Sequence, residues 1–168
     1  MHVLFVEVDT ERSWAVASIG PGTLAAYLRE HGHTVSFFRY TVDHVESDVI
    51  ERIQDTGAQL LGLSLTTRQW LRARDLVRAV RARLDIPVIT GGLHPTFSAD
   101  EVLAEPGVDF ACLGEGEEPL LELITAMEQG GDVHGIDNIQ TEPGKPPRLR
   151  APFEPMDDMP FLARDVLG

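Results

Sequence analysis

The feature of this sequence that most constrains its fold is a regular alternation of short apolar runs with segments of helical periodicity. Each apolar run has the length of a strand and ends in polar or glycine-rich residues. A segment with apolar residues three and four positions apart follows each of them. The expected strands are residues 3–8, 34–40, 60–65, 87–90 and 108–113.

Strands that alternate with helices lie parallel in one sheet, because each crossover helix carries the chain back to the same end. We therefore predict an α/β fold of the flavodoxin-like (Rossmann-like) type, with a doubly wound, five-stranded parallel sheet. Gly20-Pro21-Gly22 is expected to precede the first helix, and Ser98 and Glu101 have the spacing of a capping box that begins the fourth. The fifth helix is expected from Pro119 to Met127, with proline in its first turn.

The pattern changes after Gly130. Residues 136–140 and 148–151 flank a proline-rich turn and predict a small hairpin appended to the sheet. The last stretch has three prolines and an acidic pair, which is typical of a linker. The predicted organisation is an α/β domain over 1–135, a hairpin extension over 136–151, and a linker over 152–168 that leads toward a further domain.

Charge and cysteine content exclude several functions. The formal net charge of −13 argues against nucleic acid or an anionic membrane as a partner, because both repel an acidic surface. Cys112 is the single cysteine, so the chain forms no internal disulfide and does not hold an iron–sulfur cluster, which needs several thiolates. No apolar stretch has the length of a signal peptide core or a membrane span, so we expect a cytoplasmic location.

In an open doubly wound sheet, a ligand lies beyond the carboxyl ends of the strands. Gly91-Gly92 has no side chains and either leaves room for a bulky ligand or forms a plain tight turn. Ser64, Thr66 and Thr67 either bond a buried heterocycle or cap the next helix. His94 is open to two interpretations: it either ligates a metal or donates a hydrogen bond to a metal ligand, or it is a histidine fixed by a local hydrogen bond.

Motifs of self-contained catalysis are missing from the sequence. It has no Gly-x-Ser-x-Gly elbow, no Walker-type Gly-Lys-Thr, and no pair of metal-binding histidines on one helix face. Gly20-Pro21-Gly22 departs from the dinucleotide fingerprint, since it stands well after the first strand and lacks the third glycine. We therefore do not expect this chain to be a catalyst on its own.

The string Ile89-Thr90-Gly91-Gly92-Leu93-His94-Pro95-Thr96, followed by Val108-Asp109-Phe110 and by Gly114-Glu115-Gly116-Glu117, resembles the N-terminal cobalamin (vitamin B12)-binding domain of cobalamin-dependent radical S-adenosylmethionine (SAM) enzymes. Pro21 to Leu28 is similar to the first helix of that family. The resemblance implies a corrinoid across the strand ends, with its nucleotide tail buried beside the sheet. It implies these cofactor-binding residues: Trp14, Gly22, Ser64, Leu65, Thr66, Thr67, Arg68, Gln69, Gly91, Gly92, His94, Pro95, Thr96, Gly114, Glu115, Gly116 and Glu117.

One departure from related cobalamin proteins concerns the cobalt. Many of those proteins carry Asp-x-His-x-x-Gly after the first strand, whereas this chain has Asp9-Thr10-Glu11-Arg12 without a histidine. The resemblance then implies a base-off cobalamin that no histidine ligates, and no protein metal ligand is predicted. The lower face of the corrin would meet loop residues, for which the candidates are Arg12, Trp14, Arg68, Gln69 and Trp70.

The resemblance also implies the partner. The iron–sulfur cluster and SAM would belong only to a radical SAM domain in the same polypeptide, most often a methyltransferase and in other cases a cyclase. Two alternatives stay open: a stand-alone cobalamin carrier or sensor, and a flavodoxin-like or receiver-like interaction module without corrinoid. A receiver needs a phosphate-accepting aspartate after its third strand, where this chain has Ser64-Leu65-Thr66.

Overall fold

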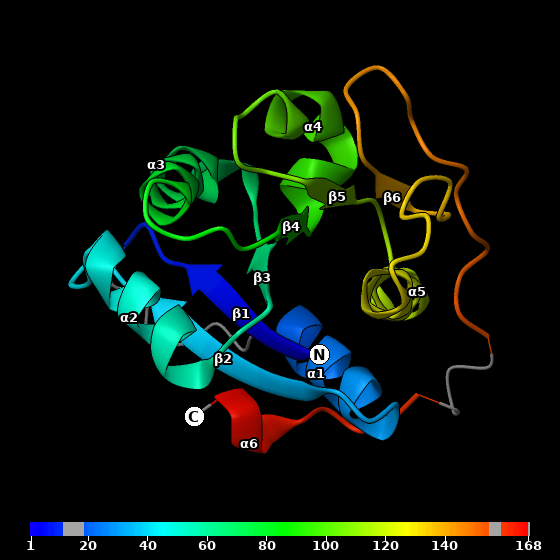
Figure 1. The fold of residues 1–168 in the computed structure, drawn as a ribbon, viewed down its shortest axis with the longest axis horizontal. Coiled ribbons are helices and arrows are strands. Elements are labelled where there is room, and N and C mark those ends of the chain that lie inside the picture. The colour runs from blue at the N-terminus through cyan, green and yellow to red at the C-terminus, as the bar shows by residue number, and fades with distance from the viewer. Residues whose placement is uncertain (12–18, 155–158, 168) are drawn as a thin grey trace.

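The computed structural model describes residues 1–11, 19–154 and 159–167. These residues form one six-stranded sheet in the order β2-β1-β3-β4-β5-β6 (Figure 1). The first five strands are parallel and β6 is antiparallel to β5. The strands are β1 (His2–Val8), β2 (Thr34–Tyr40), β3 (Leu60–Ser64), β4 (Val88–Gly91), β5 (Phe110–Cys112) and β6 (Ile139–Gln140). The predicted α/β class and doubly wound topology are confirmed.

Helices cover both faces of the sheet (Figure 1). They are α1 (Ile19–Glu30), α2 (Glu46–Thr56), a 3₁₀ turn η1 (Thr67–Gln69), α3 (Trp70–Arg81), α4 (Leu93–Leu103), α5 (Glu117–Gln129) and α6 (Arg164–Leu167). Apolar residues of α2, α3 and α4 form one core with the sheet, and those of α1 and α5 form the second core on the opposite face.

The central strand β1 shows why the sheet is buried on both sides. Leu4, Val6 and Val8 belong to the core with α2 and α3, whereas Val3 and Phe5 belong to the core with α1 and α5. Successive side chains of a strand point to opposite faces, so a strand covered on both faces is a continuous apolar run. The same alternation decides which residues of β3, β4 and β5 face each helix layer.

The first helix begins at Ile19, so Gly20-Pro21-Gly22 lies in its first turn and is not a loop before it. Proline is tolerated there, because the first amides of a helix have no intrahelical partner. A Cβ on Gly22 would lie 2.4 Å from Cδ1 of Leu162, and the amide of Ala163 donates to the Gly22 carbonyl at 3.2 Å. Glycine at this position therefore allows the C-terminal segment to pack on α1.

The fourth helix also begins earlier than the sequence predicted. It starts at Leu93, and Ser98 interrupts it with φ −136° and ψ 38°. The capping-box residue thus marks the start of the second, straight half of a kinked helix, and residues 93–96 form a helical turn where a loop was expected.

The region after α5 differs in detail from the predicted hairpin. Ile139 and Gln140 pair antiparallel with β5, whereas residues 148–151 are irregular and are tied back by the bond from the Asn138 amide to the Arg148 carbonyl, 2.9 Å. Farther along, α6 packs near α1, where Arg29 and Asp165 form an ion pair of 2.8 Å. Within the described ranges, no helix combines the length and the apolar character that a bilayer span requires.

Candidate functional site

A cavity of about 190 Å³ lies at the carboxyl end of the sheet, on the face covered by α1 and α5. Its walls come from β1, β3, β4, β5, the two helices and the loops between them. Glycines and apolar side chains predominate among the lining residues, which are Phe5, Gly20, Leu24, Gly62, Leu63, Ser64, Ile89, Gly91, Gly92, Cys112, Gly114, Glu115, Gly116, Glu117 and Leu120.

Two strand glycines shape this face of the sheet, but in different ways. Gly62 pairs with Ile89 across β3 and β4, and Ser64 pairs with Gly91. A Cβ on Gly62 would lie 2.6 Å from the Phe5 ring, so glycine lets this ring lie close to the sheet. A Cβ on Gly91 would meet only the Cβ of Cys112, at 3.8 Å, so a longer side chain there would extend into the cavity.

The size and chemistry of the cavity suit a planar heterocycle. An engineered apolar cavity of about 150 Å³ holds benzene in another protein. The cavity here is larger, at about 190 Å³, and apolar groups such as Leu24, Ile89 and Leu120 line it. Ser64, Glu115 and Glu117 add hydrogen-bonding groups. An apolar space with a few polar groups is the usual form of a small-molecule site.

Gly92 has a different role from Gly91. Its φ of 94° and ψ of −165° lie in a region that only glycine adopts readily. A Cβ on Gly92 would also lie 2.7 Å from the carbonyl oxygen of Leu65. The Leu65 amide donates to the Gly91 carbonyl at 2.8 Å, and the His94 amide donates to the Leu65 carbonyl at 3.1 Å. The tight-turn interpretation thus holds for Gly92, whereas Gly91 opens space.

The segment 114–117, which follows β5 and includes the first residue of α5, forms one wall of the cavity. Oε2 of Glu117 accepts a hydrogen bond from the Gly116 amide at 3.1 Å. Burial is the main cause that raises the pKa of Glu117, and the nearby negative charge of Glu115 adds to it. Oε2 of Glu115 accepts from the Phe153 amide at 2.7 Å, which links this wall to the chain after β6.

The predicted residues after β3 lie outside the cavity, with the exception of Ser64. Leu65 is buried in the opposite core. Thr66 donates to Oε1 of Gln69 from its amide at 2.7 Å and from its hydroxyl at 3.0 Å, which closes the turn η1. Thr67 and Arg68 are exposed, and Arg68 pairs with Glu11 at 3.2 Å.

The remaining predicted residues of the β4–α4 region, His94, Pro95 and Thr96, do not line the cavity. His94 is only 3% exposed and its ring lies 5.3 Å from that of Trp70, while Nε2 has no hydrogen-bond partner among the described residues. Pro95 is buried. The Thr96 hydroxyl donates to the Gly92 carbonyl at 2.8 Å and accepts from the Gly114 amide at 3.0 Å, so it joins two loops.

Three further predicted positions remain. Gly22 packs against Leu162 and does not line the cavity. Trp14 and Arg12 lie outside the described residues. Several lining residues of the strands and helices were not predicted from the sequence, which are Phe5, Gly20, Leu24, Gly62, Leu63, Ile89, Cys112 and Leu120. A signal existed for Gly62, because a glycine inside an apolar strand marks a close approach of another group.

Cys112 supplies a probe of the cavity wall. It is buried, and burial raises its pKa to about 12. The thiol therefore stays protonated at pH 8, and thiolate is the form that reacts. We expect iodoacetamide to label native Cys112 on the order of a thousandfold more slowly than the urea-unfolded chain, as measured by mass spectrometry. Equal rates in the two states would show that the wall is open.

Comparison with known proteins adds a second line of evidence. Residues 15–124 match the family model described as the B12 binding domain. The chain belongs to the B12-binding domain family. The anaerobic magnesium-protoporphyrin IX monomethyl ester cyclase of Rubrivivax gelatinosus is 37% identical over 139 residues, which cover 77% of this chain and 25% of the cyclase.

Two solved radical SAM enzymes contain the same fold as this B12-binding domain. OxsB with aqua-cobalamin and SAM bound superimposes with a TM-score of 0.81 at 20% identity, over 99% of this chain and 24% of OxsB. The methyltransferase TsrM of Kitasatospora setae, with cobalamin and a [4Fe-4S] cluster bound, gives 0.69 at 20% identity, over 86% of this chain and 30% of TsrM. The resemblance to the cobalamin-binding domain of radical SAM enzymes, inferred from the sequence, is confirmed. The chain spans about a quarter of the length of the cyclase.

Proposed function

We propose that this B12-binding domain holds a cobalamin whose nucleotide tail enters the cavity between the sheet and helices α1 and α5. The observation that carries the proposal is the hollow beside Gly91, where a side chain would fill the space. The family match and the position at the carboxyl end of a doubly wound sheet support it. Cobalamin supplies a reactive cobalt centre, and the protein supplies binding and orientation.

The residues that line the cavity contribute space, apolar contacts and hydrogen-bonding groups for the nucleotide tail. Gly91 leaves the space, Gly62 lets the Phe5 ring lie close to the sheet, and the apolar side chains of Leu24 and Leu120 exclude water. Ser64 and Glu117 offer hydrogen-bonding groups to a heterocycle or a sugar. The exposed turn with Thr66, Thr67, Arg68 and Gln69 lies beyond the strand ends, where the corrin ring would lie.

We further propose that the cobalamin is bound base-off and without a histidine ligand. The sequence from Asp9 to Arg12 contains no histidine. His94 is buried beside Trp70 and does not line the cavity, which supports a structural role for it. The benzimidazole base of the nucleotide tail cannot occupy the cavity and coordinate the cobalt at the same time. Binding of the tail in the cavity therefore requires the base-off state.

The proposed partner is a radical SAM domain in the same polypeptide, and the proposed reaction is most often methyl transfer, with cyclisation as the variant. The iron–sulfur cluster and SAM would bind in that domain, because Cys112 is the single cysteine here. In this organisation, residues 1–135 bind cobalamin, 136–151 extend the sheet, and 152–168 lead toward the partner domain.

The direct test is retention of cobalamin. The purified chain is mixed with hydroxocobalamin and desalted, and the visible spectrum of the protein fraction is recorded. We expect the corrinoid to elute with the protein and to show a base-off spectrum. A colourless protein fraction would contradict cobalamin binding, and a base-on spectrum would contradict the proposed position of the tail.

A further inference from the structure

Asn138 has an unusual backbone conformation for a buried residue. It is the one non-glycine residue with positive φ, 66°, in the part of the chain that the structure describes. Its exposed fraction is 5%. Asparagine tolerates the left-handed region better than most residues, because its short side chain bonds locally. This conformation must be held by its surroundings.

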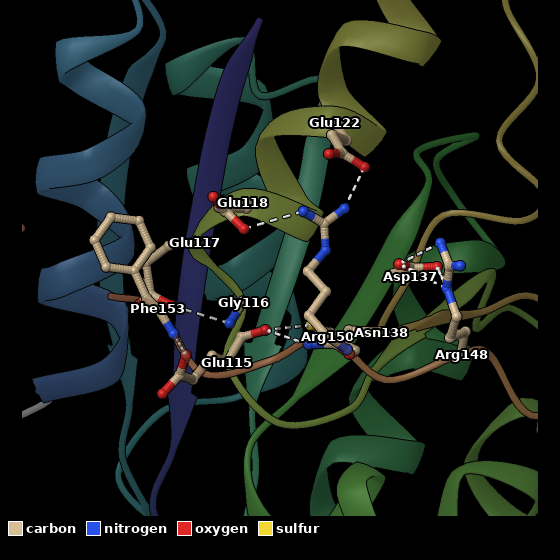
Figure 2. A network of polar contacts seen from close by, with 11 residues as sticks. Glu115, Gly116, Glu117, Glu118, Glu122, Asp137, Asn138, Arg148, Arg150 and Phe153 are labelled. Carbon is tan, nitrogen blue, oxygen red and sulfur yellow. Dashed lines mark hydrogen bonds and ion pairs between the residues drawn. The ribbon is translucent and has the colours of Figure 1, made fainter. Parts of the chain in front are cut away.

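Four hydrogen bonds provide that support. The carbonyl of Asn138 accepts from the Leu113 amide at 2.8 Å, and its amide donates to the Arg148 carbonyl at 2.9 Å. Its side chain donates from Nδ2 to the Glu115 carbonyl at 3.2 Å and accepts at Oδ1 from the Arg150 amide at 2.8 Å. Figure 2 shows Asn138 beside Arg150, in the same network as Glu115. Asn138 thus ties residues 113–115 to residues 148–150.

Residues 148–153, here called the strap, run from Asn138 to the helices that wall the cavity. The Arg150 guanidinium donates to Glu118 at 3.0 Å and to Glu122, both on α5 (Figure 2). The Phe153 amide donates to the Glu115 carboxylate at 2.7 Å. The Phe153 ring packs edge-on against Tyr27 of α1, with the ring centroids 6.2 Å apart. The strap therefore joins α5, the wall segment 114–117 and α1.

The contacts with the strap oppose an electrostatic repulsion within the wall segment and the start of α5. Glu115, Glu117 and Glu118 stand within four residues at the start of α5, and like charges at this distance repel. Arg150 brings one positive charge to this acidic group. The Nδ2 bond of Asn138 fixes the backbone at Glu115, which lines the cavity, although Asn138 itself does not.

We propose that Asn138 is a positioning residue for the ligand of the cavity, because it ties the wall segment 114–117 to the strap. This inference rests on the proposed function, because that function identifies the ligand as cobalamin. Beyond that function, it states that cobalamin retention depends on Asn138, which does not line the cavity. An aspartate at 138 keeps the acceptor for Arg150 and the size of the side chain, but loses the donor and places a carboxylate against the Glu115 carbonyl.

The experiment compares Asn138→Asp with wild type and with Asp137→Asn. The control removes the ion pair between Asp137 and Arg148, 2.9 Å, at the neighbouring position and leaves the Asn138 side-chain bonds in place. Affinity is measured for hydroxocobalamin and for cobinamide, which lacks the nucleotide tail. Hydrogen exchange of the amides at 114–117 is measured without any corrinoid.

For Asn138→Asp we expect the affinity for hydroxocobalamin, relative to that for cobinamide, to fall about tenfold. Exchange at 114–117 should accelerate, while the amides of β1 keep their protection. Asp137→Asn should match wild type in both measurements. General loss of structure would lower both affinities together, so an unchanged ratio, or unchanged exchange at 114–117, would overturn the proposal.

A second variant keeps the test valid if Asn138→Asp fails to fold. Asn138→Gly adopts positive φ without strain and keeps both backbone bonds, but removes both side-chain bonds. The same fall in the affinity ratio and the same faster exchange are expected. If wild type retains no cobalamin, the proposed function fails, and hydrogen exchange alone still decides whether Asn138 holds the wall segment.

Discussion

Replacing Gly91 by valine is expected to abolish cobalamin retention, with a loss of affinity of at least about a hundredfold. Gly91 faces the cavity, and a Cβ there meets only the Cβ of Cys112, at 3.8 Å. The backbone accepts the substitution, so the two methyl groups occupy ligand space and leave the fold intact. Equilibrium dialysis against hydroxocobalamin measures the loss, and a thermal melt confirms folding.

Thr90→Val is the matched control for this substitution. Thr90 precedes Gly91 in β4 and is fully buried on the opposite face of the sheet. Valine has nearly the same shape as threonine and removes only the hydrogen bond to the Phe110 carbonyl, 3.3 Å. We expect Thr90→Val to bind like wild type. If Gly91→Val also binds like wild type, the tail does not occupy this cavity.

Gly92→Ala is expected to lower the free energy of unfolding by about 2–4 kcal/mol. The backbone at Gly92 has φ 94° and ψ −165°, and the new Cβ would lie 2.7 Å from the Leu65 carbonyl oxygen, which is backbone and cannot rotate away. Urea unfolding followed by circular dichroism measures the change. At this chain length each kcal/mol lowers Tm by about 2–4 °C.

Gly57→Ala separates the two causes of that destabilisation. Gly57 also has a positive φ, 63°, but nothing lies within 4 Å of a Cβ placed there. Its substitution should cost only about 1–2 kcal/mol, from the left-handed backbone alone. Equal effects of the two substitutions would show that the contact with Leu65 does not constrain Gly92. Because Gly92→Ala destabilises the fold, a loss of cobalamin binding in that variant would reflect unfolding. Gly91 is therefore the position that tests the ligand site.

The sequence predicted the inner strands of the sheet well because they are buried on both faces, and the ranges 60–65 and 108–113 contain β3 and β5. Such strands appear as continuous β-branched and apolar runs, which no other local signal obscures. The range 34–40 also coincides with the edge strand β2, which is only partly buried. The carboxyl-end rule predicted that Ser64, Gly91 and Glu117 lie near one another, and all three line the cavity, because the topology of a doubly wound sheet fixes where its loops meet.

Features that depend on tertiary contacts were not predictable from local pattern. The contact of Gly22 with Leu162 joins α1 to a segment far along the chain, and no pattern around Gly22 indicates it. The start of α4 at Leu93 was not predicted, because the capping-box spacing of Ser98 and Glu101 indicated a later start. The left-handed conformation of Asn138 is set by four hydrogen bonds to two other segments, none of which the sequence around 138 reveals.

A crystal structure of the chain with hydroxocobalamin bound tests the central claim most directly. We expect the benzimidazole base to lie between the sheet and helices α1 and α5, next to Gly91. We also expect that no histidine reaches the cobalt. Electron density for the base on the cobalt, with protein side chains or solvent filling the cavity, would show that the nucleotide tail does not bind in this cavity.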